Sequence, residues 1–316
     1  MPRVLVASPH RYPDLARLWY RAVARDLVPA LERAGLEAKV VVFRDGHVDE
    51  FDPARFPGAI LEAPGPGARD FLEFYDKALS YDSDYLFLLD ADLFFVDPDW
   101  PGSWLPAFDD PDVAAVSFLR RSEHPGVYAL LCRTAHYRAL SGPVFLPTYE
   151  HLDDEKKRVN RQPGDVAARR LREQGRKILY ADPAAAEKRI ADFHGTTVIR
   201  ASREVFGQLM SAASFDELLS RKRYFAMGAY DNALLGSLYQ QVFGEPFAPG
   251  PNGEPLGGSV KAETTRLELE RIHDGDLKTA LEEYFDRSDR AIKLLIAREG
   301  IELELPSLRP ASWRRA

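Results

Sequence analysis

The sequence predicts an α/β fold: a mostly parallel sheet flanked by helices, followed by a mainly helical C-terminal region. Two observations carry this expectation. In the first part of the chain, two expected strands, Val4–Ala7 and Glu37–Phe43, flank a segment of helical periodicity, residues 14–34. A strand, a helix and a strand within about 45 residues form a βαβ unit, whose strands are parallel. From Ser202 onward, the apolar residues recur mainly at helical spacing.

The expected elements follow one another with turn residues between them. Short, β-branched or aromatic runs predict strands, and Gly35 is placed to end the first long helix. The polar section 148–162 is expected to be solvated loop or helix surface. The expected strands are 4–7, 37–43, 85–89, 113–118, 126–132 and 178–180, and the expected helices are 14–34, 68–81, 164–175, 184–192, 202–220, 227–243, 261–272 and 276–299.

Composition limits the function classes. The chain has 316 residues, 45% hydrophobic and 29% charged, with a net charge of −7, which argues against nucleic acid as the main partner. Cys132 is the single cysteine, so no disulfide framework is expected. The first residues lack the long apolar core of a signal peptide, and no run reaches the roughly 18 apolar residues of a membrane span. We therefore expect a cytoplasmic protein without a membrane span.

Two carboxylates, Asp90 and Asp92, follow the apolar run Tyr85–Leu89. In an extended chain, residues two apart point to the same side, so both carboxylates are expected at the carboxyl edge of the sheet. Open α/β sheets bind ligands at that edge, and paired carboxylates suit Mg²⁺ or Mn²⁺ carrying a phosphate. The alternative is that both residues serve as turn or cap residues.

Seven motifs follow one another in a fixed order: Val4–Pro9, the strand ending at Asp45, Leu88–Asp92, Val127–Arg133, Asp165–Gly175, Ile178–Tyr180 and His194-Gly195. In this order they resemble the nucleotide-sugar half of a GT-A glycosyltransferase, closest to the large family 2 group, over roughly residues 3–200. The sequence departs from the family pattern in two places: Gly164 stands where many members have Glu or Asp, and Asp45 is followed by Gly46-His47.

The resemblance implies a GT-A type, Rossmann-like fold and a metal-dependent glycosyltransferase, in particular a hexosyltransferase. Such an enzyme moves a sugar from a nucleotide-diphosphate sugar, a UDP- or GDP-sugar, to an acceptor hydroxyl, here unidentified. Mn²⁺ or Mg²⁺ neutralises the charge that develops on the diphosphate. The implied metal ligands are Asp90, Asp92 and His194, and the implied donor contacts are Pro9, Asp45, Asp90 and Arg120.

Asp165 is the implied general base, which takes the proton of the acceptor hydroxyl. The alternative role for Asp165 is helix N-cap, and Asp231, at another expected helix start, is a rival for the base. His194 also has an alternative to the role of metal ligand: it could be a structural histidine that is hydrogen-bonded in a loop.

We expect two parts: residues 1–204 as the nucleotide-sugar-binding GT-A catalytic domain, and residues 205–316 as a helical region. The helical region would form the acceptor cleft, a lid or an oligomer contact. Residues 244–258 are rich in Gly and Pro and are expected to be either a lid over the donor or a surface linker.

Two other classes stay open. A haloacid-dehalogenase-like phosphatase also uses two Asp residues two apart, but it favours Thr or Val where Phe94 stands, and it usually carries the pair on its first strand. A catalytically silent nucleotide-sugar-binding protein is the non-enzymatic alternative. A sugar-phosphate nucleotidyltransferase is disfavoured because the segment Val6–Pro13 has no glycine.

Overall fold

The computed structural model divides the chain into two compact units, Met1–Ile190 and Ala191–Ala316. The predicted boundary at 204/205 lies outside the described residues. Those residues are 1–10, 12–44, 51–63, 72–118, 129–141, 144–145, 149–152, 157–160, 164–193, 215–247, 275–305 and 309.

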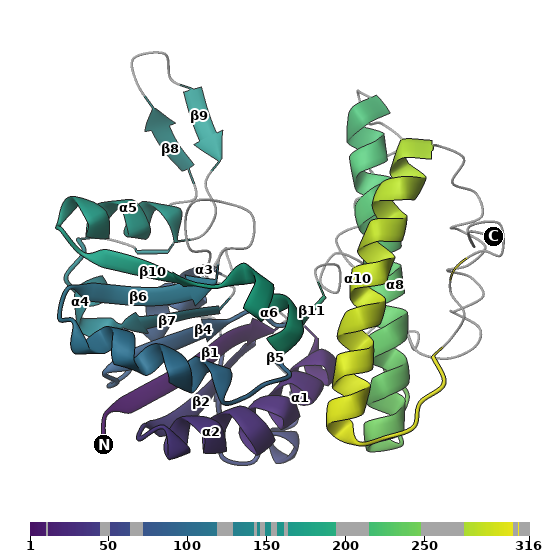
Figure 1. Ribbon diagram of the computed structural model, residues 1–316, viewed down its shortest axis with the longest axis horizontal. Coiled ribbons are helices and arrows are strands. Elements are labelled where there is room, and N and C mark those ends of the chain that lie inside the picture. Colours follow the sequence, from purple (N-terminus) through teal and green to yellow (C-terminus); the bar gives the residue numbers. More distant parts are fainter. Residues whose placement is uncertain are drawn as a thin grey trace. The chain divides into compact units, whose positions relative to one another are not determined.

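A seven-stranded sheet with the order β10-β6-β7-β4-β1-β2-β3 forms the centre of the first unit (Figure 1). The pairings β1–β2, β1–β4, β2–β3 and β6–β10 are parallel, whereas β7 is antiparallel to both β4 and β6. The predicted α/β class with a mostly parallel sheet is confirmed. The strands are β1 (Arg3–His10), β2 (Glu37–Arg44), β3 (Ile60–Glu62), β4 (Tyr85–Leu89), β6 (Val113–Phe118), β7 (Ala129–Arg133) and β10 (Lys177–Ala181).

Helices cover both faces of this sheet. On one face, α1 (Pro13–Ala22) and α2 (Val28–Arg33) pack against β1 and β2 (Figure 1). The other face carries the apolar core, to which Leu5 and Ala7 of β1 and Leu86 and Leu88 of β4 contribute. That core is completed by α3 (Leu72–Ala78), α4 (Thr134–Arg138) and α5 (Asp165–Glu173).

The long helix expected over residues 14–34 is present, with an irregularity in its middle. A π-helical turn, Val23–Leu27, separates α1 from α2, and Gly35 follows with φ of +88°. Pro29 lies at the start of α2 and has no N–H to donate to the preceding turn. The wider turn accommodates that missing hydrogen bond.

Other elements differ from the expectation. The polar section expected as loop contains an antiparallel strand pair, β8 (Tyr149–Leu152) and β9 (Lys157–Asn160). Edge strand β3 was not expected, because it has only three residues and is half exposed. A 3₁₀-helical segment, Trp100–Asp109, follows the short strand β5 (Leu93–Phe95). The helix expected over 184–192 is shorter: α6 (Pro183–Arg189) leads into β11 (Ile190–Asp192), which crosses the division between the units.

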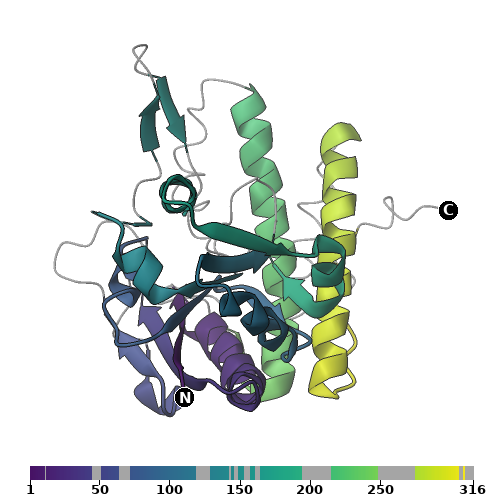
Figure 2. The same ribbon diagram turned by 60° about the vertical axis from the view of Figure 1, so that its left-hand side comes forward.

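The second unit is mainly helical in its described part, as predicted. Helices α8 (Phe215–Phe243) and α10 (Gly275–Glu299) lie side by side in both views (Figures 1 and 2). Residues 202–214 and 248–274, which carry other expected helices and most of the predicted lid, lie outside the described residues. Where the structure describes the chain, no helix combines the length and the apolar character needed to cross a membrane.

Candidate active site

The carboxyl ends of β1, β2 and β4 meet at one edge of the sheet. Ala7 of β1 lies opposite Leu88 of β4, and His10 of β1 lies opposite Arg44 of β2. From β1 the strand order runs to β2 and β3 on one side and to β4 on the other. This reversal between β1 and β4 is a topological switch point, where open α/β sheets bind their ligands.

The acidic pair lies at this switch point, directly after β4. Asp90 is half-buried and Asp92 is 6% exposed. The backbone turns immediately after Leu89, and the Leu93 amide donates to the Asp90 carbonyl at 3.3 Å. The two carboxylates are therefore held by a turn, so the side-to-side alternation expected of an extended strand does not describe them. Their predicted position at the end of a buried strand is correct.

The donor set of this turn fits a hard divalent cation, because carboxylate oxygens are the ligands that Mg²⁺ and Mn²⁺ prefer. In the part of the chain that the structure describes, no group of three or more His, Cys, Asp or Glu side chains is placed to hold a metal ion. His194, the third predicted ligand, lies outside that part.

Four aromatic side chains pack together beside the acidic turn. Phe87 of β4 contacts Phe95 of β5, with ring centroids 5.6 Å apart, and Trp104, at 5.9 Å. Trp100 lies 6.4 Å from Phe95 and 5.0 Å from Trp104. These four rings, the aromatic cluster hereafter, join the strand before the acidic pair to the strand after it. Dense packing of this kind limits the movement of the turn between them.

The end of β1 carries a buried polar residue that lies beyond the strand expected over residues 4–7. His10 is 1% exposed, and its ring centroid lies 4.8 Å from that of Trp19 in α1. Burial lowers the pKa of His10 to about 3, so its imidazole is neutral at physiological pH. Neither His10 nitrogen has a hydrogen-bond partner among the described residues. Pro9, the predicted donor contact, is half-buried at the same edge.

Asp165 is the first residue of α5, and Gly164 before it is the N-cap, with φ of +90°. The alternative role considered for Asp165, that of helix N-cap, therefore falls to Gly164, whose left-handed conformation favours glycine. β10 is parallel to β6, and a short connection joins α5 to the amino end of β10. The amino end of α5, with Asp165, consequently points toward the carboxyl edge of the sheet.

Asp231, the rival base, lies in the interior of α8 and not at a helix start. Gly228 lies within this helix without ending it. The Asp231 side chain is 0% exposed and accepts hydrogen bonds from Tyr284 Oη and, at 2.6 Å, from Ser288 Oγ of α10. A carboxylate enclosed between two helices in this way is not accessible to an acceptor hydroxyl in this conformation.

The remaining predicted site residues, Asp45, Arg120 and His194, lie outside the described residues, and the structure leaves their roles as predictions.

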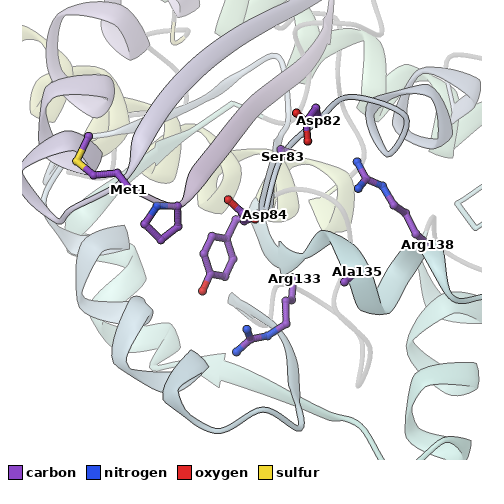
Figure 3. A pocket seen from close by; sticks show the side chains of 9 residues that line it. Met1, Asp82, Ser83, Asp84, Arg133, Ala135 and Arg138 are labelled. Carbon is purple, nitrogen blue, oxygen red and sulfur yellow. The ribbon is translucent and has the colours of Figure 1, made fainter.

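One pocket, of about 590 Å³, opens at the opposite, amino edge of the sheet (Figure 3). Its lining includes Asp82, Asp84, Arg133 and Arg138, and no predicted site residue. The charges there are engaged locally. Asp82 pairs with the Arg3 guanidinium, Asp84 accepts from the Arg3 amide at 2.7 Å, and Arg138 Nε donates to the Leu79 carbonyl at 2.6 Å. This pocket is therefore distinct from the acidic turn.

No protein-family model matches the sequence, and no curated protein matches it either. Solved structures do resemble the fold. One is the mannosyltransferase PcManGT from Pyrobaculum calidifontis in complex with GDP-Man and Mn²⁺, with 14% identity, a TM-score of 0.45, and coverage of 94% of this chain and 87% of that one.

Residues 1–349 of TarS from S. aureus match with 10% identity, a TM-score of 0.38 and 98% coverage of both chains. A 4-diphosphocytidyl-2C-methyl-D-erythritol synthase matches with 14% identity and a TM-score of 0.34, over 59% of this chain and 96% of that one. Likeness at this level concerns the arrangement of the chain alone. Glycosyltransferases recur among the matched structures, together with cytidylyltransferases.

Proposed function

We propose that this protein is a metal-dependent glycosyltransferase that moves a sugar from a nucleotide-diphosphate sugar to an acceptor hydroxyl. The observation that carries the proposal is the position of Asp90 and Asp92, in one turn at the switch point between β1 and β4. This is where an α/β sheet binds a ligand, and the ligand that paired carboxylates favour is a metal-bound phosphate.

The proposed chemistry follows from the charges of the substrate. When the sugar leaves a nucleotide-diphosphate sugar, negative charge develops on the diphosphate, and a divalent cation supplies the compensating positive charge. Asp92 would hold Mn²⁺ or Mg²⁺, and Asp90 would contact the metal through water or the donor ribose. The Tyr85–Leu89 strand and the aromatic cluster keep both carboxylates in place. His194 as third ligand, and Asp45, Pro9 and Arg120 as donor contacts, are further parts of the proposal.

Asp165 is the proposed general base. It lies at the amino end of α5, which points toward the same edge of the sheet as the acidic turn. The enclosure of Asp231 between α8 and α10 supports the choice of Asp165 over Asp231. We further propose a hexosyl group on UDP or GDP, a cytoplasmic location, and a role of the helical region in the acceptor site.

The proposal is tested by following release of sugar from candidate UDP- and GDP-sugars with and without Mn²⁺. We expect slow hydrolysis of one donor that requires Mn²⁺ and is lost in Asp92→Asn. Asp99→Asn is the matched control, because Asp99 belongs to the same region but is exposed and paired with Arg33 at 2.7 Å. Metal-independent release, or equal release by Asp92→Asn, would refute the proposal. Release of phosphate from p-nitrophenyl phosphate would instead favour the phosphatase, which no observation on the described residues supports.

A further inference from the structure

Arg189, the last residue of α6, binds the chain directly beyond the acidic turn. Its carbonyl accepts hydrogen bonds from the backbone amides of Val96, at 2.8 Å, and Asp97, at 3.1 Å. Its guanidinium Nη1 donates to Asp97 Oδ2 at 2.8 Å. Backbone and side chain of one residue thus attach to the same short segment, only a few residues after Asp92.

The same guanidinium also reaches the aromatic cluster. Arg189 Cζ lies 5.8 Å from the ring centroid of Trp100, within the range of a cation–π contact. Trp100 is 7% exposed and packs on Trp104, which contacts Phe87 of β4. Arg189 therefore contacts both the end of β5 and the cluster that links β5 to β4.

We infer that Arg189 is a positioning residue for the acidic turn and sets the affinity of that turn for its divalent cation. The inference rests on the proposed function. The turn is held on one side by β4, in the middle of the sheet, and on the other side by the three residues of β5, which end at the Arg189 contacts. If the second attachment loosens, Asp92 loses its fixed position although its own packing is unchanged. Residues that orient metal ligands from outside commonly change metal affinity when they are replaced.

The Arg189–Asp97 pair contributes little to the stability of the fold. Its effect on metal binding can therefore be measured separately from any effect on folding. The two side chains are 42% and 38% exposed, and ion pairs this exposed are screened by solvent. A change in Mn²⁺ affinity without a comparable change in melting temperature is therefore the signature of positioning. A merely structural role would change both together or neither.

The test is calorimetric titration of Mn²⁺ into the full chain in the presence of excess UDP in one series and of excess GDP in another, with the heat of Mn²⁺ titrated into each nucleotide alone subtracted. Arg189→Met keeps the apolar stem and removes the charge, and Asp97→Asn removes the partner. We expect each to weaken Mn²⁺ binding about 3- to 10-fold, and the double variant to be no weaker than either single one. Arg189→Lys, which keeps a cation near Asp97, should recover part of the loss. Melting temperatures of all variants should stay near that of the wild type.

Arg33→Met is the matched control, because Arg33 forms an Arg–Asp ion pair of similar distance, 2.7 Å, with Asp99. Among the described residues, Arg33 makes no hydrogen bond to Asp97 and no cation–π contact with Trp100. This variant should bind Mn²⁺ as the wild type does. Wild-type affinity in both Arg189→Met and Asp97→Asn, with Asp92→Ala inactive in binding, would overturn the inference and leave the proposed function intact. Absence of Mn²⁺ binding by the wild type would overturn both.

Discussion

Asp90 and Asp92 are two residues apart, yet their surroundings differ. Asp90 is half-buried, whereas Asp92 is 6% exposed inside the turn. In the proposed function, Asp92 is the main metal ligand, and Asp90 contacts the metal through water or the donor ribose.

His10 should make the free energy of unfolding depend on pH. Its pKa is about 3 in the folded protein because of burial, against about 6.5 in an unfolded chain. The unfolded state therefore binds more protons between these values, and the free energy of unfolding falls as the pH drops from 6.5 toward 3. His10→Phe keeps an aromatic contact with Trp19 and removes the titrating group.

Denaturant unfolding of wild type and His10→Phe at pH 7, 6, 5 and 4 measures this difference. The wild type should lose more stability below pH 6 than the variant, by at most about 1.4 kcal/mol per pH unit. Parallel pH profiles would show that His10 is protonated in the folded protein as readily as in the unfolded chain.

Single residues also show where the sequence was insufficient. The unbroken apolar run Tyr85–Leu89 predicts a buried strand, and this strand places Asp90 and Asp92 at its end. His10 was missed, because Pro9 made the chain look like a loop there, whereas β1 continues to His10 at full register with β2. The turn at Asp90 could not be predicted from the sequence either. The alternation of side chains along a strand does not indicate where the backbone leaves the extended conformation.

At the scale of elements, α8 and α10 share a buried polar contact. Tyr284 and Ser288 of α10 both donate to Asp231 of α8, and Tyr230 stacks on Phe285 with ring centroids 3.9 Å apart. Asp231→Ala would leave two buried hydroxyls without this acceptor and open a cavity. We expect the free energy of unfolding to fall by about 2–4 kcal/mol.

Chemical denaturation of Asp231→Ala and Asp286→Ala tests this expectation. Asp286 is exposed on the same α10 and pairs with Arg309 at 2.7 Å, so its replacement should cost less than about 1 kcal/mol. If Asp231→Ala unfolds like the wild type while transfer is abolished, Asp231 is a catalytic residue and not a structural one.

The position of α5 leads to a prediction about catalysis. Asp165→Asn fills the same space but cannot accept the proton of an acceptor hydroxyl, so donor binding should persist and transfer should fall at least about 100-fold. Initial rates of Asp165→Asn and Asp231→Asn, measured with the same donor and acceptor, compare the two candidates directly. A loss confined to Asp231→Asn would move the base into the helical region.

The helices and strands of this protein differ in how well they can be predicted from the sequence. Long periodic segments such as 276–299 were identified almost to their ends, because many apolar residues share one face. The interruption of α1 and α2 depends on how the chain accommodates Pro29, and β8 and β9 are polar strands that pair with each other. Neither feature leaves a hydrophobic pattern, so neither could be predicted.

For the whole molecule, the class of the fold and the position of the acidic pair at the end of a central strand were predictable, and the antiparallel strand was not. Consecutive strands alternating with helices predict a parallel sheet, and the Tyr85–Leu89 strand is indeed central in it. The reversal of β7 between β4 and β6 depends on the connections around it and on long-range pairing, which the apolar run 126–132 does not encode. The switch point between β1 and β4 can be located only when the order of the strands in the sheet is known. The prediction of a ligand site at that point therefore depends on the structure.

We expect the turn after β4 to bind a divalent cation together with a nucleoside diphosphate. Calorimetric titration of UDP and GDP, each with and without Mn²⁺, into wild type, Asp92→Ala and the control Asp99→Ala measures it most directly, with circular dichroism to confirm folding. We predict that one nucleotide binds the wild type and Asp99→Ala only with Mn²⁺, and that folded Asp92→Ala loses this binding. Unchanged Mn²⁺-dependent affinity in folded Asp92→Ala would contradict the claim.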